Sequence, residues 1–241
     1  MLFEQEIFIN TVCLIWFFAC WVGYTFYARQ KATSQSCLAS ELHKYREYWM
    51  RRVMLRDVRV GDAALFANLE RNVSFLASTS ILILAGLLTV FTVTDEISVL
   101  VTQIPFASHT SPLSIQLKVA LLLVIFVYAF FTFTWSMRQY GFCSIMLGGA
   151  PMVEEEGVTA MERERYAFYA ARVIDLAGLS YNHGLRAYYF ALSVLAWFVS
   201  PYLFILASGF VVAVLYRREF KSRSLRALRH KDGANEHPIN L

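Results

Sequence analysis

"SVLAWFVSPYLFILASGFVVAVLYRREF", residues 193–220, decides how often this chain can cross a membrane. It ends an uncharged stretch of 30 residues, Ala187 to Tyr216, that contains a single proline, Pro201, near its midpoint. One crossing needs about 20 apolar residues, so the stretch is too long for one upright helix. A straight helix would be about 45 Å long and would need a tilt of about 48°. The stretch therefore predicts a helical hairpin that turns at Ser200–Pro201, or one long kinked crossing.

The hairpin has a physical cost of its own. Its two halves would reach only about 21–24 Å into a hydrocarbon core about 30 Å thick. The turn would then lie inside the membrane, where backbone groups must be covered by protein. Because proline lacks an N–H and clashes with the preceding turn, we favour a re-entrant hairpin at Pro201 and keep the kinked crossing as the alternative.

Composition places the whole chain in the membrane class. Of 241 residues, 57% are hydrophobic and only 17% are charged, against about a quarter in soluble domains. All 40 charged residues lie outside four apolar segments, 7–28, 73–93, 119–137 and 187–216. The predicted fold is all-α: a multi-pass transmembrane helical bundle with three full crossings plus the hairpin or a fourth crossing, forming one domain over residues 1–241.

The distribution of basic residues predicts the orientation. If residues 187–216 enter and return, 21 Lys and Arg residues lie on one side of the membrane and only Lys118 on the other. If they cross once, the division is 14 against 8. Since Lys and Arg collect in cytoplasmic loops, we expect the N-terminus outside and the C-terminus in the cytoplasm, in the inner (plasma) membrane. The first segment is predicted to be a retained crossing, because no basic residue precedes it.

The polar segments carry helix signals. Apolar residues at helical spacing predict an interfacial cytoplasmic helix over 37–54. A further helix is expected after Gly61, with Asp62 as its cap, running into the second apolar segment. "TAME" at 159–162 is a capping box, and the helix it opens is expected to end near Gly178, before a turn at 181–184.

Arginines form the candidate binding site. Arg52, Arg56 and Arg59 have helical spacing and would form one stripe if the helix over 37–54 continued. In the hairpin topology they would face the two ends of the last apolar segment, which suits a site for an anionic lipid headgroup or a phosphate group. The six residues are Arg52, Arg56, Arg59, Arg186, Arg217 and Arg218. Simple anchoring of the chain by positive charge is the interpretation that we favour, and the binding site is the alternative.

Small residues form a candidate contact face in the second apolar segment. Small side chains let helices approach closely in lipid. We expect helix packing through this face, with a conduction path as the alternative. The residues are Ser74, Ser78, Ala85 and Thr89.

Other site chemistry is not expected. The apolar segments hold no ionisable side chain, which weighs against a proton-coupled carrier. The four cysteines form no metal-type pair, and Asp57 and Asp62 have no nucleophile at readable spacing. We therefore expect no catalytic residue, no metal site and no cofactor.

Several motifs follow one another along nearly the whole chain. They are "WVGY" (21–24), "RDVRVGDA" (56–63), "FLASTSILILAGLL" (75–88), "FTFTWSMRQY" (131–140), "NHGLRAYYFALSVLAWFVSP" (182–201) and "VLYRREF" (214–220). In this order they resemble one uncharacterised membrane family, domain of unknown function 599. The resemblance implies a multi-pass membrane fold and supplies no activity or catalytic residue.

Three functional hypotheses remain open from the sequence. The first is a non-enzymatic module that is channel-like or contacts lipid, and the second is a structural or assembly subunit of a larger membrane complex. The third is a lipid-modifying enzyme that uses the polar cluster at 51–72. The expected partners are membrane lipids, with anionic lipids as one option, and either further copies of the chain or a complex partner; nucleic acid is not expected.

Overall fold

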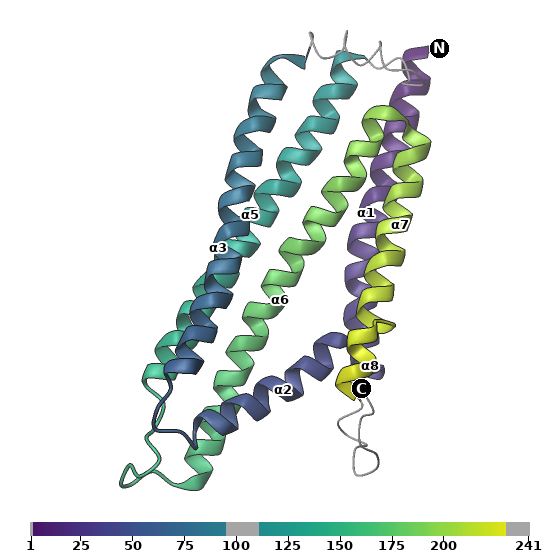
Figure 1. Ribbon diagram of the computed structural model, residues 1–241. Helices are drawn as coiled ribbons and strands as arrows, with labels where there is room; N and C mark the ends of the chain where they lie inside the picture. Colours follow the sequence, from purple (N-terminus) through teal and green to yellow (C-terminus); the bar gives the residue numbers. More distant parts are fainter. Residues whose placement is uncertain (1, 95–110, 230–241) are drawn as a thin grey trace, which may run out of the picture.

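The computed structural model describes residues 2–94 and 111–229, and every regular element in this part of the chain is an α-helix (Figure 1). The helices are α1 (Leu2–Ser34), α2 (Leu38–Val53), α3 (Val60–Thr92), α5 (Pro112–Gly148), α6 (Ala160–Val199), α7 (Pro201–Phe220) and α8 (Arg223–Arg229).

The long helices α1, α3, α5, α6 and α7 run along the molecule, and α2 lies across one end of them (Figure 1). α5 packs against both α3 and α6, α7 packs against both α6 and α1, and α2 packs against α6. The N-terminus lies at the end opposite α2, whereas α8 lies beside the start of α2 (Figure 1). We call these two ends the N-terminal end and the α2 end.

Three helices are long and apolar enough to cross a membrane: Glu6–Lys31, Val60–Thr92 and Pro112–Gly148. Large apolar side chains also lie on the outer surface of the bundle, among them Phe26, Phe75, Leu82 and Phe210. Water would penalise so much exposed apolar area, and lipid would not. The prediction of an all-α fold is thus confirmed for the described residues, and the three apolar helices support a membrane location.

The predicted break at Pro201 is confirmed. α6 ends at Val199, Ser200 is extended (φ −158°, ψ 140°), and Pro201 is the first residue of α7. Proline is favoured at this position because the first N–H of a helix has no intrahelical partner and the ring presets φ. α7 then runs back along α6, so the two helices form a hairpin whose turn lies at the N-terminal end (Figure 1).

The expected helix end near Gly178 and the turn at 181–184 are wrong. α6 is continuous over 40 residues. Its glycines serve close approach: a Cβ at Gly184 would lie 2.5 Å from the Phe133 ring, and one at Gly178 would lie 2.9 Å from the Arg46 guanidinium. Contacts with neighbouring helices therefore override the weak local turn signal.

Helix starts were predicted with mixed success. The helix over 37–54 is confirmed as α2, which Cys37 caps, and the Thr159–Glu162 capping box opens α6. The assignment of Asp62 as a cap is wrong. α3 begins at Val60, and Asp62 lies buried in its first turn, where it accepts hydrogen bonds from other side chains.

Within the described single chain, the predicted packing face of α3 is not the buried face of this helix. Ser78, Ala85 and Thr89 are exposed and Ser74 is half-buried. The buried side of α3 carries Val73, Ala77 and Ser80 instead. Ser80 is fully buried because its hydroxyl meets the Tyr188 hydroxyl of α6 at 3.0 Å, an interhelical partner that residue size alone does not reveal.

Candidate functional site

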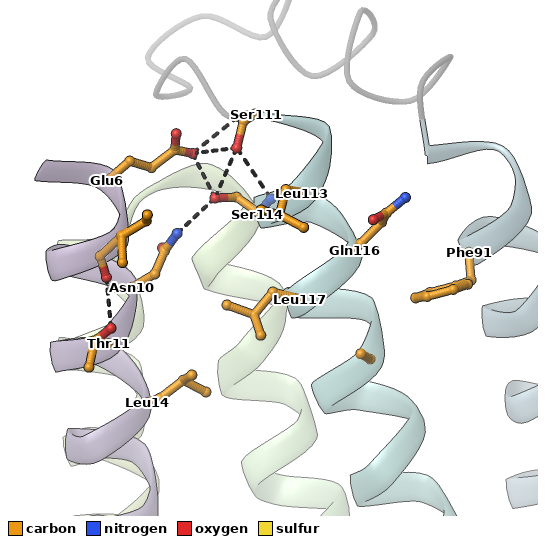
Figure 2. A pocket seen from close by; sticks show the side chains of 12 residues that line it. Glu6, Asn10, Thr11, Leu14, Phe91, Ser111, Leu113, Ser114, Gln116 and Leu117 are labelled. Carbon is orange, nitrogen blue, oxygen red and sulfur yellow. Dashed lines mark hydrogen bonds between the residues drawn. The ribbon is translucent and has the colours of Figure 1, made fainter. Parts of the chain in front are cut away.

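A polar cluster joins α1 to α5 at the N-terminal end (Figure 2). Glu6 Oε1 accepts hydrogen bonds from the Ser114 hydroxyl at 2.6 Å and from the Ser111 hydroxyl and backbone N–H, both at 3.1 Å. Asn10 Nδ2 donates to the Ser114 hydroxyl at 2.7 Å. These side chains come from positions more than 100 residues apart, so the cluster fixes how α1 lies against α5.

The start of α5 explains why the carboxylate lies there. Ser111 is the N-cap, its hydroxyl accepts from the Ser114 N–H, and Pro112 opens the helix. The first N–H groups of a helix are unpaired and carry partial positive charge. Glu6, supplied by α1, therefore completes the cap of α5 with a negative charge.

A pocket of about 390 Å³ lies beside the cluster, between α1 and α5 and reaching α3 (Figure 2). One part of its wall is the polar cluster, to which Thr11 and Gln116 add. The remaining wall is apolar and is formed by Ile7, Leu14, Phe91, Leu113, Leu117 and Ala120. A wall of this kind fits a molecule with one polar end and one apolar end.

The polar wall of the pocket presents acceptors. Gln116 donates its Nε2–H to the Thr94 hydroxyl, and Asn10 donates its Nδ2–H to Ser114. Within residues 2–94 and 111–229, no hydrogen bond reaches Glu6 Oε2 or the amide oxygens of Asn10 and Gln116. The pocket can thus accept hydrogen bonds from hydroxyl or amino groups of a bound molecule.

Lys118 lies one helical turn below Ser114 and is 3% exposed. Its Nζ is 5.7 Å from the ring centroids of both Trp197 and Phe198, at the end of α6. Trp197 Nε1 is itself buried with no hydrogen-bond partner in the described chain. The sequence analysis missed this site because it placed the start of the third apolar segment at residue 119. The helix that is long and apolar enough to cross the membrane covers Pro112–Gly148, and Lys118 lies within it. An ionisable group inside a membrane helix is a candidate functional residue.

The predicted arginine stripe does not form. α2 ends at Val53, so Arg56 precedes α3 in a connection and Arg59 is the N-cap of α3. Arg56 pairs with buried Asp62 at 2.8 Å. Arg59 donates to the backbone carbonyls of residues 150 and 151, and Arg52 donates to the Tyr48 hydroxyl. Arg56 and Arg59 thus connect different elements of the fold, whereas Arg52 contacts a residue one turn earlier in its own helix.

The other three arginines lie elsewhere. Arg186 lies over the Tyr24 ring, with 5.4 Å from Cζ to the centroid, and Arg218 donates to the Tyr189 hydroxyl. Arg217 is in the last turn of α7. The end of α7, which carries Arg217 and Arg218, lies at the start of α2 (Figure 1). Arg59 follows the opposite end of α2, in the connection to α3. These arginines therefore do not form one vestibule.

Polar contacts hold the α2 end. Asp175 of α6 binds both His43 and Arg46 of α2, the latter at 2.7 Å. Tyr166 donates to the Met146 carbonyl at 2.7 Å, and burial raises the pKa of its phenol. The sequence analysis missed the two Asp175 pairs, because no spacing rule connects residues about 130 positions apart.

The carboxylates at 57 and 62 do not form a pair. Asp62 accepts from Trp49 Nε1 at 2.7 Å and from Arg56, whereas Asp57 is exposed in the connection between α2 and α3. In the described part of the chain, no three His, Cys, Asp or Glu side chains gather closely enough to hold a metal ion.

Comparison with known proteins gives one result. Neither curated proteins nor solved structures gave a match to the chain. The model of one family, described as protein of unknown function, DUF599, matches residues 12–224. This range contains every helix from α2 to α7 and most of α1. The chain therefore belongs to the DUF599 family.

Proposed function

We propose that this protein crosses the inner membrane five times, through α1, α3, α5, α6 and α7, with its N-terminus outside. α7 has 20 residues and is about 30 Å long, which matches the hydrocarbon core. The sequence places 21 of its 22 Lys and Arg residues in segments 29–72, 138–186 and 217–231. A cytoplasmic α2 end follows from this charge distribution.

This topology is tested with reporters active on only one side of the membrane, fused after Leu241 and within the 95–110 connection. The two fusions should report opposite sides. Reports from the same side would exclude an odd number of crossings after α3.

We further propose that the protein is a non-enzymatic, lipid-contacting module. The observation that carries this proposal is the pocket at the N-terminal end, with an acceptor-rich polar wall and an apolar remainder. In the proposed topology it lies in the outer half of the bilayer. Its ligand would be an amphiphile whose head donates hydrogen bonds and whose chain lies along Leu14, Leu117 and Ala120.

The inside of the bundle favours lateral binding over a channel through one chain. Deeper than the pocket, the interhelical space is filled by large aromatic side chains that are almost completely buried, Phe17, Phe133, Phe190 and Phe204. Phe17 stacks on Phe204 with centroids 5.6 Å apart and meets Phe190 edge-on at 5.7 Å. Such contacts leave no room for a water-filled path between those helices.

Filling the pocket tests this function. Ala120→Phe places a ring in the pocket, whereas Val124→Phe adds a ring one turn further along α5 at a site that is 62% exposed. Native mass spectrometry of the purified full chain should show an amphiphile retained by the wild type and by Val124→Phe, and lost from Ala120→Phe. Equal retention by both variants would overturn the proposal.

A structural or assembly role is the second candidate. The observation behind it is the small-residue face of α3, where Ser78, Ala85 and Thr89 are exposed within the described part of the chain. Such a face suits close approach of a helix from another copy or subunit. If Ser78→Leu changes the oligomeric state in detergent while Leu82→Ile does not, this role is favoured.

A further inference from the structure

A second hollow runs along the outside of the α1–α7 pair. It has a volume of about 590 Å³ and is open to the surroundings of the bundle. Ala19 and Gly23 of α1 and Gly209 and Ala213 of α7 form its floor, and the aromatic side chains of Trp16, Tyr24, Tyr27 and Tyr216 also line it. Trp16 also donates to the Ile205 carbonyl at 3.2 Å, which fixes the two helices at one end of the groove.

The other end of the groove is cationic. Lys31 Nζ donates to the Tyr27 hydroxyl at 2.7 Å and to the Tyr216 hydroxyl at 3.2 Å, and both tyrosines line the groove. Lys221 Nζ lies 5.7 Å from the Tyr216 ring centroid. Two ammonium groups and two phenols thus gather where the apolar groove meets the α2 end.

We propose that this groove binds an anionic phospholipid of the cytoplasmic leaflet. One acyl chain would lie over the floor formed by Gly23, Gly209 and Ala213, and the phosphate would lie beside Lys31 and Lys221. The inference rests on the proposed orientation of the bundle, and not on the pocket at the N-terminal end. Tyrosines and lysines at such a depth are typical of the membrane interface, and each basic residue strengthens binding to anionic lipid.

Charge favours a lipid over a second copy of the chain. Two copies inserted in the same direction bring their α2 ends to the same depth. Docking in this groove would therefore place the basic segments of one copy near Lys31 and Lys221 of the other. An anionic headgroup meets the same two ammonium groups with the opposite sign.

The experiment uses the full chain in nanodiscs that contain equal amounts of a phosphatidylglycerol and a phosphatidylcholine, followed by native mass spectrometry after release into detergent. The wild type should retain phosphatidylglycerol preferentially. Lys31→Gln should lower its occupancy about fivefold, the equivalent of one basic contact. Arg226→Gln, which removes an exposed charge of α8 outside the groove, should leave occupancy unchanged.

Groove shape is tested separately from charge. At both Gly23 and Gly86 a Cβ would meet no atom within 4 Å, so both positions tolerate a larger side chain. Gly23→Leu fills the groove and should abolish preferential retention. Gly86→Leu adds the same bulk to α3, outside the groove, and should retain the lipid.

Three outcomes would overturn the proposal. They are equal retention of both lipids by the wild type, equal loss in Lys31→Gln and Arg226→Gln, and a Gly23→Leu variant that loses a dimer while lipid occupancy is unchanged. The last would assign the groove to a second copy. Because Ala120→Phe acts on the other pocket, failure here is distinguishable from failure of the proposed outer-leaflet site.

Discussion

The two ends of the bundle satisfy their polar groups in opposite ways. At the α2 end, Arg46, Arg56 and Arg59 reach carboxylates or carbonyls of the chain itself. At the N-terminal end, one carboxylate and two serines link α1 to α5. Three oxygen atoms of the pocket wall, Glu6 Oε2 and the amide oxygens of Asn10 and Gln116, receive no hydrogen bond within the described chain. The α2 end thus stabilises the arrangement of the helices, whereas the N-terminal end keeps hydrogen-bonding capacity for a ligand.

The difference has a chemical origin. A guanidinium group has five donors in a planar fork on a long stem, so one arginine can bridge two elements. Arg59 does this when it donates to two successive carbonyls in the connection between α5 and α6. Serine hydroxyls are short and reach only adjacent groups, so the network around Ser114 stays local and leaves the pocket open. The abundant arginines of the α2 end therefore indicate that this end satisfies its polar groups with partners from the chain itself.

The largest effect is expected from Asp62→Ala at the α2 end. The carboxylate is 3% exposed and accepts hydrogen bonds from Trp49 and Arg56. Breaking a buried pair costs about 3 kcal/mol in the free energy of unfolding, which is measured by denaturation in mixed micelles. Asp57→Ala, five residues earlier and exposed, should change it by less than about 0.5 kcal/mol. Similar losses for both variants would show that the network around Asp62 does not hold this end.

Lys118→Met is expected to stabilise the N-terminal end by about 1–2 kcal/mol, because a buried ammonium that forms no ion pair with a carboxylate of the described residues is costly. Arg138→Met is the control, since Arg138 is an exposed cation of the same helix, and it should change stability little. Unfolding in mixed micelles measures both. A loss of stability in Lys118→Met would mean that the amine supports the fold, and would remove the contrast between the two ends.

Ser114→Ala is expected to lower the free energy of unfolding by about 1 kcal/mol, because it removes the hydroxyl that links Asn10 to Glu6. Ser144→Ala on the same helix removes a hydroxyl that, within the described residues, donates to the carbonyl of Tyr140 four residues earlier and links no second helix, so it should be nearly silent. Thermal unfolding in detergent compares the two variants. If Ser114→Ala costs as much as Asp62→Ala, the N-terminal end is held as firmly as the α2 end.

Local signals in the sequence were sufficient for part of the fold. The break at Pro201 and the capping box at Thr159–Glu162 follow from the chemistry of a few adjacent residues, and both are present. The role of Gly184 could not be predicted in this way, because it depends on Phe133 of another helix. Asp62 was misassigned for the same reason: its partner Trp49 lies 13 residues earlier, in another helix.

The candidate site was harder to predict than the fold. Glu6 and Ser114 are 108 residues apart, and nothing in their spacing indicates that they meet. Lys118 did carry a signal, since it is the single basic residue between positions 94 and 118 and directly precedes an apolar segment. A hydropathy analysis places the boundary of an apolar segment at such a residue. Whether the Lys118 side chain is buried depends instead on a neighbouring helix, here the end of α6 at Trp197.

The smallest effect is expected at the first turn of α6, and it depends on pH. Hydrogen bonds from the Thr159 backbone N–H and hydroxyl to Glu162 lower the pKa of this exposed carboxyl below its usual value of 4.5. A carboxyl whose pKa is lower in the folded state stabilises the fold above its unfolded pKa, and the contribution is lost as pH falls through the folded value. Thermal unfolding between pH 6 and pH 3 should therefore show a shallower loss of stability for Glu162→Gln than for the wild type. Glu156→Gln, an exposed position in the preceding connection, should follow the wild-type curve. If Glu162→Gln also follows the wild-type curve, the capping box contributes nothing measurable to stability. The stability of the α2 end then depends on its interhelical pairs alone.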